Sequence, residues 1–281
     1  MVTLVTGATG FIGRRLMQQD HRAMVRCAAG FKHEVIGDLR DRHSLEIACD
    51  GIKVVFHCAG HAHWPTSSPY DIHHEVNYQG VKNLLYAAGR AGVRRFIFLS
   101  SVKAMAEPGE QCVDEDWPGA PTSQYGLAKR AAEEAVLEMG ELYGMHVVNL
   151  RLAMVYGRGV RGNFDRLVRG LGVGWFPVLP ETGNRRSLVH VQDVVTAIRV
   201  VADRPEANQQ TYIVADPVSY SGRELCDAIR SVKSARGFSW SVPAWALRFG
   251  GKVGDLSGQL FCRQMPINSE VVSRLLDSEC Y

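Results

Sequence analysis

A glycine-rich turn between the first strand pattern and the first helix pattern constrains the fold of this chain more than any other feature. The apolar run Val2–Val5 leads into Thr-Gly-Ala-Thr-Gly-Phe-Ile-Gly at positions 6–13. Gly7 permits a tight turn, Gly10 lets backbone amides approach a phosphate, and Gly13 allows the helix to pack closely on the strand. The motif therefore predicts a strand–turn–helix unit that binds the pyrophosphate of a dinucleotide.

Short runs rich in β-branched residues alternate with longer helical patterns up to Arg151, as in parallel βαβ units. Beyond Arg151 glycine-rich loops surround helical segments instead. We expect an α/β fold in which residues 1–151 form a Rossmann-type doubly wound parallel sheet. Residues 152–281 should form a smaller substrate-binding lobe, with some segments packing back on the core. The expected strands are Val2–Val5, Ala23–Val25, Val35–Ile36, Lys53–His57, Arg95–Leu99 and His146–Arg151, and the expected helices are Phe11–Gln19, Ser44–Ala48, Val76–Arg90, Ser123–Met139, Phe164–Arg169, Val191–Ala202 and Ser221–Val232.

Composition narrows the class of protein. The 281 residues are 46% hydrophobic and carry a formal net charge of +3, which is too small to indicate nucleic acid or an anionic membrane as a partner. No apolar run reaches membrane-spanning length and no basic leader opens the chain, so we expect a cytoplasmic protein. The odd number of cysteines and the lack of a Cys-x-x-Cys pair favour reduced thiols; the cysteines are residues 27, 49, 58, 112, 226, 262 and 280.

Two positions at the carboxyl ends of the second and third strands bear on the choice of cofactor. Asp38 lies where an adenine ring should rest and could accept from its amino group. Arg26 stands where an acidic residue would bind a ribose hydroxyl, which tilts the interpretation toward NADP, although an arginine can also stack on adenine. NAD and NADP both remain open.

The fourth predicted helix, Ser123–Met139, carries a tyrosine and a lysine that could transfer a proton. Tyr125 and Lys129 are four residues apart, so their side chains share one helix face. A nearby ammonium favours the phenolate, and we expect the pKa of Tyr125 to fall toward neutrality unless burial opposes it. Ser100 and Ser101 end the preceding strand, where a hydroxyl could hold a reacting oxygen, and Ser101 suits this role better.

Taken in order, these motifs resemble the extended short-chain dehydrogenase/reductase family, and its NAD-dependent nucleotide-sugar epimerase/dehydratase branch in particular. The branch includes UDP-glucose 4-epimerases and nucleotide-sugar 4-ketoreductases. The resemblance implies Ser101, Tyr125 and Lys129 as catalytic residues, and a homodimer formed through helices 76–90 and 123–139. The matching segments are residues 6–13, Asp38, residues 57–60, Asn77 with Gly80, Ser100–Ser101, residues 125–129 and residues 186–193. The cofactor-binding residues implied are Gly7, Thr9, Gly10, Phe11, Ile12, Arg26, Asp38, Leu39, Cys58, Ala59, Gly60, Asn77, Ser100, Tyr125 and Lys129.

The substrate class follows from a basic segment. Arginines outnumber acids between residues 151 and 186, and their fork geometry suits a diphosphate. A solvated basic face is the alternative. The resemblance adds Arg186 as a contact of the substrate pyrophosphate and Asn163 and Phe164 as part of a nucleotide-binding loop. His61 and His63 could lie against the sugar, whereas a metal site is not expected because no third ligand cluster appears. The arginines are residues 151, 158, 161, 166, 169, 185 and 186.

Taken with these features, the resemblance implies an enzyme that transfers hydride at carbon 4 of a UDP-hexose, with Tyr125 moving the hydroxyl proton and Ser101 fixing the oxygen. An epimerase would retain NAD and reduce its own 4-keto intermediate; a 4-ketoreductase would exchange NADPH. A non-catalytic NAD(P)-sensing protein is the alternative from another class. The first helix is short, and Ala153-Met154 replaces the family's usual Phe-Asn, which weakens the specific epimerase assignment.

Overall fold

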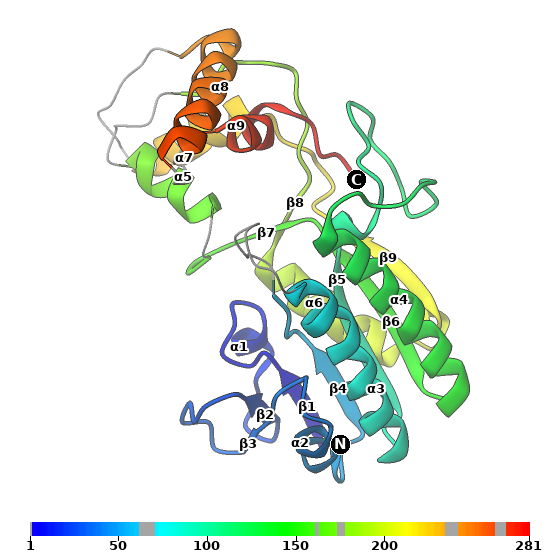
Figure 1. Cartoon of the computed structure of the whole chain (residues 1–281). Coiled ribbons are helices and arrows are strands. Elements are labelled where there is room, and N and C mark those ends of the chain that lie inside the picture. The colour runs from blue at the N-terminus through cyan, green and yellow to red at the C-terminus, as the bar shows by residue number, and fades with distance from the viewer. Residues whose placement is uncertain (1, 62–70, 161–162, 173–177, 234–240, 262–267) are drawn as a thin grey trace. The chain divides into compact units, whose positions relative to one another are not determined.

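The structure, a computed structural model, describes residues 2–61, 71–160, 163–172, 178–233, 241–261 and 268–281. Within this part of the chain a seven-stranded sheet has the order β3-β2-β1-β4-β5-β6-β9 (Figure 1), and every pairing is parallel. This arrangement confirms the predicted Rossmann-type fold. The strands are β1 (Thr3–Thr6), β2 (Arg22–Val25), β3 (Glu34–Ile36), β4 (Val54–His57), β5 (Arg95–Ser101), β6 (His146–Leu152) and β9 (Gln210–Val214).

Helices cover both faces of the sheet, which explains why its central strands are buried apolar runs. Helices α2, α3 and α4 pack side by side on one face, and α1 and α6 pack on the other (Figure 1). Every residue of β1 and β4 is buried. The helices of this layer are α1 (Gly13–Leu16), α2 (Arg42–Cys49), α3 (Gly80–Arg90), preceded by the π-helical stretch His73–Gln79, α4 (Gln124–Tyr143) and α6 (Val191–Asp203).

The first helix is shorter than its sequence pattern predicted. We expected a helix over Phe11–Gln19, but α1 spans only four residues. Met17 leaves the helical region with ψ of 131°, and the chain then runs directly into β2. The reason is the small number of residues between Gly13 and β2, because a longer helix would leave too little chain to return to the start of the next strand.

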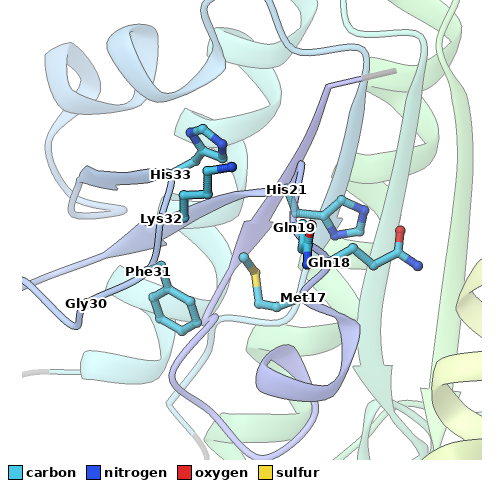
Figure 2. A pocket seen from close by; sticks show the side chains of 8 residues that line it. All are labelled: Met17, Gln18, Gln19, His21, Gly30, Phe31, Lys32 and His33. Carbon is cyan, nitrogen blue, oxygen red and sulfur yellow. The ribbon is translucent and has the colours of Figure 1, made fainter.

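A hollow of about 540 Å³ lies where the chain leaves α1 (Figure 2). Its lining segments precede β2 and β3, so it opens at the amino ends of these parallel strands. The glycine turn follows β1 and therefore lies at the opposite edge of the sheet. The hollow is thus separate from the predicted cofactor site, and it is lined by Met17, Gln18, Gln19, His21, Gly30, Phe31, Lys32 and His33.

Strand β9 and helix α6 return to the sheet from late in the chain. The sequence analysis predicted α6 but no strand over Gln210–Val214, which pairs with β6 along its whole length. The compact unit that contains the sheet accordingly comprises residues 1–107, 114–157 and 189–215. A short separate sheet joins β7 (Met154–Tyr156) to β8 (Leu188–His190).

The second compact unit comprises residues 108–113, 158–188 and 216–281. Leu171, Val178, Leu179 and Cys226 form its small apolar core. Its described helices are α5 (Asn163–Gly172), α7 (Gly222–Lys233), α8 (Ala244–Phe261) and α9 (Ser269–Leu276). None of the helices in the described part of the chain is long and apolar enough to cross a membrane.

A disulfide joins Cys112 to Cys280 within the second unit, so the expectation of reduced thiols was wrong for this pair. The two cysteines are 168 residues apart and are brought together by parallel backbone bridging, in which the Val113 amide donates to the Cys280 carbonyl at 3.2 Å. No local spacing could reveal such a contact. Cys27, Cys49, Cys58 and Cys226 are free thiols, and Cys262 lies outside the described residues.

Candidate active site

The glycine turn between β1 and α1 is packed too tightly to accept side chains. Gly7 has φ of +66°, and a Cβ atom there would lie 2.8 Å from the Ala59 amide nitrogen. A Cβ on Gly13 would collide with the Gly7 carbonyl oxygen. The Ala59 amide also donates to Thr6 Oγ1 at 3.2 Å, so the turn and the loop after β4 are held together. The turn therefore packs closely on the loop after β4 and on the start of α1, at positions that only glycine can fill.

The neighbouring carboxylate already has a partner within the chain. Arg40 donates to Asp38 through Nε at 3.0 Å and Nη2 at 2.7 Å, and this contact lowers the pKa of Asp38 to about 2. Asp38 is thus an anion that holds Arg40 and retains acceptor capacity. Arg26 is exposed and contributes to lowering the pKa of Asp38, while Leu39 is buried against Gly80.

Asn77 fixes the loop Cys58–His61 through both ends of its amide. Its Oδ1 accepts from the His61 amide at 2.7 Å, and its Nδ2 donates to the His61 carbonyl at 2.8 Å. A Cβ atom on Gly60 would lie 3.2 Å from Asn77 Oδ1 and 3.6 Å from Lys129 Nζ. The loop after β4 therefore closely approaches the predicted catalytic lysine.

Tyr125, Ser101 and Lys129 come together at the carboxyl end of β5, as their motif predicts. The Ser101 side chain acts on Tyr125 by favouring its phenolate. Lys129 is only 5% exposed; its Nζ donates to the Leu99 carbonyl at 2.8 Å and lies 4.6 Å from the centre of the Phe98 ring. Burial lowers the pKa of Lys129 to about 8.

The expected fall in the pKa of Tyr125 was wrong for the chain as it stands. Burial raises the pKa of Tyr125, and the Ser101 side chain offsets only part of this effect. The hydrogen bond from Lys129 goes to the Leu99 carbonyl, so the ammonium does not ion-pair with the phenol. Desolvation therefore outweighs the attraction that the helical spacing suggested.

Sequence reasoning missed two groups that surround this site. The His73 ring packs edge-on against Tyr125 with ring centres 5.6 Å apart, and it lies one turn before Asn77. Glu133 lies one turn after Lys129 and forms a buried ion pair with Arg151. The four-residue spacing along each helix is the signal that could have identified both residues.

The proposed substrate residues divide between the two units. His61 lies in the loop after β4, whereas Asn163 and Phe164 begin α5 and Arg186 belongs to the second unit. Arg186 is buried and pairs with Glu279 at 3.1 Å. His63 lies outside the described residues.

The basic segment is less available to a ligand than its composition suggested. Arg151 is buried in its pair with Glu133, so counting it toward a diphosphate site was wrong. Arg169 pairs with Asp165 on α5. Across the described residues there is no group of three or more His, Cys, Asp and Glu side chains arranged to hold a metal ion.

Comparison with known proteins gives a consistent result. The model of a family described as the NAD dependent epimerase/dehydratase family matches residues 3–215. A UDP-glucose 4-epimerase of Vibrio cholerae is 34% identical over 268 residues, which cover 89% of this chain and 81% of that protein. The structure of the UDP-glucose 4-epimerase of Thermus thermophilus in complex with NAD is 26% identical with a TM-score of 0.71, and covers 86% of each chain. The structure of MoeE5 in complex with UDP-glucose and NAD is 25% identical with a TM-score of 0.74 and the same coverage.

Proposed function

Because the chain belongs to the NAD-dependent epimerase/dehydratase family, we propose that it is a nucleotide-sugar epimerase acting at carbon 4 of a UDP-hexose. One observation carries this proposal. The Ser101 side chain favours the phenolate of a half-buried Tyr125, and Lys129 is buried one turn further along the same helix. This arrangement suits proton exchange with a sugar hydroxyl, and the related proteins named above include UDP-glucose 4-epimerases.

NAD, when bound, supplies hydride acceptance and return at the sugar carbon. In this proposal Tyr125 accepts the proton from the carbon 4 hydroxyl and returns it, while Ser101 holds the same oxygen. Lys129 stabilises the phenolate and binds the nicotinamide ribose. The positive charge of oxidised nicotinamide would further favour the phenolate, and so oppose the effect of burial on Tyr125.

The dinucleotide would lie along the carboxyl edge of β1, β2 and β4. Gly7 and Gly13 support this placement because they let the turn pack tightly against the loop after β4 and against the start of α1, as in a dinucleotide-binding turn. Asp38 would accept from adenine while keeping Arg40. We propose that the remaining contacts come from Thr9, Gly10, Phe11, Ile12, Arg26, Leu39, Cys58, Ala59, Gly60, Asn77 and Ser100.

The nature of the cofactor would separate the two candidate reactions. An epimerase would use NAD, and Arg26 can stack on the adenine of NAD. Arg26 can also bind the extra phosphate of NADP. An exchangeable NADPH would indicate a 4-ketoreductase instead. We favour NAD, because the Thermus thermophilus epimerase and MoeE5 structures contain it.

For the nucleotide sugar we propose contacts from His61 to the hexose, from Asn163 and Phe164 to the nucleotide, and from Arg186 to the diphosphate. Arg186 would have to bind the diphosphate while Glu279 also contacts it. An arginine has five N–H donors, so it can serve a carboxylate and a phosphate together.

We also propose that the enzyme is a homodimer formed through α3 and α4 and that it works in the cytoplasm. Tyr86 of α3 and Leu127 of α4 expose apolar surface on one face of the sheet layer, which supports such an interface. The Cys112–Cys280 disulfide argues against a cytoplasmic location, because cytoplasmic thiols are kept reduced.

Replacement of the catalytic tyrosine tests the proposal. Wild type should convert UDP-glucose to UDP-galactose with NAD, and Tyr125→Phe should lose at least about 100-fold in kcat, in line with general acid–base catalysis. NAD binding, followed by protein fluorescence, should be unchanged in Tyr125→Phe. Equal activity of the two proteins would refute the mechanism. Cofactor binding by wild type without turnover of any UDP-hexose or 4-keto sugar would support a sensing role instead.

A further inference from the structure

A buried ion pair behind the active site has no role in the proton transfer described above. Glu133 is 2% exposed and Arg151 is 5% exposed. Arg151 Nη2 lies 2.9 Å from Glu133 Oε2, and Arg151 Nε lies 3.1 Å from Oε1. Arg151 Nη1 also donates to the Glu115 carbonyl at 3.3 Å. Both charges are thus desolvated and held in a fixed, two-pronged contact.

The pair is connected to the catalytic residues at two points. Ser100 Oγ donates to Glu133 Oε1 at 2.5 Å, and Ser100 immediately precedes Ser101 on β5. Glu133 also lies one turn after Lys129 on α4, where its charge raises the pKa of that lysine against the effect of burial. The carboxylate therefore contacts the strand that carries the serine and acts on the lysine.

Stability alone is a weak reason for a buried ion pair. Desolvation of two charges costs several kcal/mol per ion, and apolar residues of similar volume often serve as well or better. Glu133 of this pair accepts a hydrogen bond from Ser100 of β5 and lies one turn from Lys129, so the pair has another use. It can set the electrostatic potential of the site.

The charged and polar groups around the catalytic residues come from five elements. Lys129 faces His57 and Cys58 at the end of β4, both of which are kept neutral by burial. Tyr125 faces Ser101 of β5 and His73 of the π-helical stretch. From α4 and β6 come Glu133 and Arg151, so the fixed buried charges here are two cations and one anion.

We propose that Glu133 and Arg151 are positioning residues that hold Ser100 and keep the net fixed charge at the site to one positive unit. This inference depends on the proposed function only for the predicted effect on kcat; the predicted effect on the pKa of Tyr125 does not depend on it. Arg151 neutralises Glu133, so the carboxylate does not cancel the charge of Lys129. Below its pKa of about 8, Lys129 is then the uncompensated cation, and its positive charge is available to the phenolate of Tyr125.

The sign of the expected change follows from this balance. Glu133→Gln keeps an acceptor for Ser100 but leaves Arg151 unpaired, so the site gains one positive charge. A second cation favours the phenolate, and the apparent pKa of Tyr125 should fall by about one unit. Replacing both partners, as in Glu133→Gln with Arg151→Met, removes a neutral pair and should return the pKa of Tyr125 toward its wild-type value.

Phenolate absorbance measures this directly and needs no substrate. The ultraviolet absorbance of each protein is recorded immediately after pH jumps, and that of the same background carrying Tyr125→Phe is subtracted to isolate Tyr125. The matched control is Glu134→Gln, the next residue along α4, whose exposed side chain pairs with Arg130. It should leave the titration unchanged because solvent screens its charge.

Kinetics provides the second readout. The acid limb of the pH profile of kcat should move to lower pH by about one unit in Glu133→Gln and move back in the double variant. Near-ultraviolet circular dichroism identifies any variant that has lost its fold, and the double variant should remain folded because neither charge is left unpaired. The proposal is overturned if the pKa of Tyr125 in Glu133→Gln equals that of wild type, or if the double variant has the same pKa of Tyr125 as Glu133→Gln. Absence of turnover would refute the proposed reaction but leave the absorbance titration informative.

Discussion

At the scale of single residues, burial and charge oppose each other in the candidate active site. Lys129 is buried and Tyr125 is half-buried, and loss of solvent disfavours the charged form of each: it raises the pKa of the phenol and lowers that of the ammonium. The charged forms of both residues are therefore destabilised by desolvation, and bound ligands of opposite charge can offset this effect. Oxidised nicotinamide would favour the phenolate, and a phenolate would in turn favour the ammonium.

The low pKa of Lys129 makes folding stability depend on pH. An unfolded lysine titrates near pH 10.5, whereas burial lowers the pKa of Lys129 to about 8. Between these values the unfolded chain binds more protons than the folded chain, so the free energy of unfolding rises with pH. We expect wild type to gain about 3 kcal/mol relative to Lys129→Met across this window.

Urea unfolding near pH 7 and near pH 10, followed by tryptophan fluorescence, checks this expectation. Lys252→Met removes an exposed lysine from α8 and should keep the pH dependence of wild type. A constant difference between wild type and Lys129→Met at both pH values would contradict the assignment of a buried ammonium.

The sequence predicted Tyr125 and Lys129 as catalytic residues but did not predict their neighbours, for a physical reason. Tyr125 and Lys129 are four residues apart, and helical geometry alone predicts that their side chains share one face. The partners of Arg151 and Arg186 are Glu133 and Glu279, which contact them only through the tertiary fold. A local count of arginines could not tell an internal ion pair from a free cation.

At the scale of secondary structure, the start of α4 determines where Tyr125, the proposed catalytic tyrosine, lies. Ser123 caps the helix, since its Oγ accepts from the Gly126 amide at 3.1 Å, and Tyr125 is the second residue inside. The helix ends with Gly144 in the left-handed conformation, where glycine bears no steric cost. The boundaries of α4 are thus set by local chemistry. The predicted start at Ser123 agrees with its cap, whereas the predicted end at Met139 fell short of Tyr143 because the Gly144 cap was overlooked.

We predict that Ser123→Ala lowers the free energy of unfolding by about 1 kcal/mol, because one amide of the first turn loses its acceptor. Ser123→Asp should retain nearly all the stability, since aspartate is an equally good cap. Urea denaturation of the three proteins provides the measurement. If Ser123→Ala and Ser123→Asp lose the same amount, the hydrogen bond to Gly126 contributes nothing.

The predicted bounds of helices and strands were wrong where contacts in the tertiary structure determine them. The pattern over Phe11–Gln19 is helical, yet the chain has to return to the start of β2 and α1 stops at Leu16. Strand β9 is a short polar-and-apolar segment without clear alternation, and only its pairing with the open edge of β6 makes it a strand. Such choices depend on what the rest of the fold leaves unpaired.

At the scale of the whole molecule, the disulfide closes a very long loop. Cys112 and Cys280 are 168 residues apart, and loop entropy for such a crosslink corresponds to about 5 kcal/mol at most. We expect dithiothreitol to lower the melting temperature of wild type and to leave that of Cys112→Ser unchanged. Calorimetry with and without reductant, together with a thiol count, makes the comparison. An unchanged melting temperature on full reduction would show that the crosslink adds no stability.

The proposed dimer can be tested through its exposed apolar residues. Tyr86→Glu combined with Leu127→Glu would bury like charges across an interface formed by α3 and α4, so we expect a monomer in sedimentation velocity experiments. Val200→Glu changes an exposed residue of α6 on the opposite face and should leave the dimer intact. A monomeric wild type, or a dimer that survives both substitutions, would refute this interface.

The late return of β9 has a consequence for how the protein is made. Strand β6 ends at Leu152, but the strand that covers its edge begins at Gln210. At roughly 5 to 20 residues per second, a ribosome needs several seconds to synthesise the intervening chain. During that time β6 presents an unpaired edge, which is the kind of surface that other nascent chains can add to. Chaperone contact, if the protein requires it, should therefore concentrate on chains whose synthesis has passed β6 but not yet reached β9.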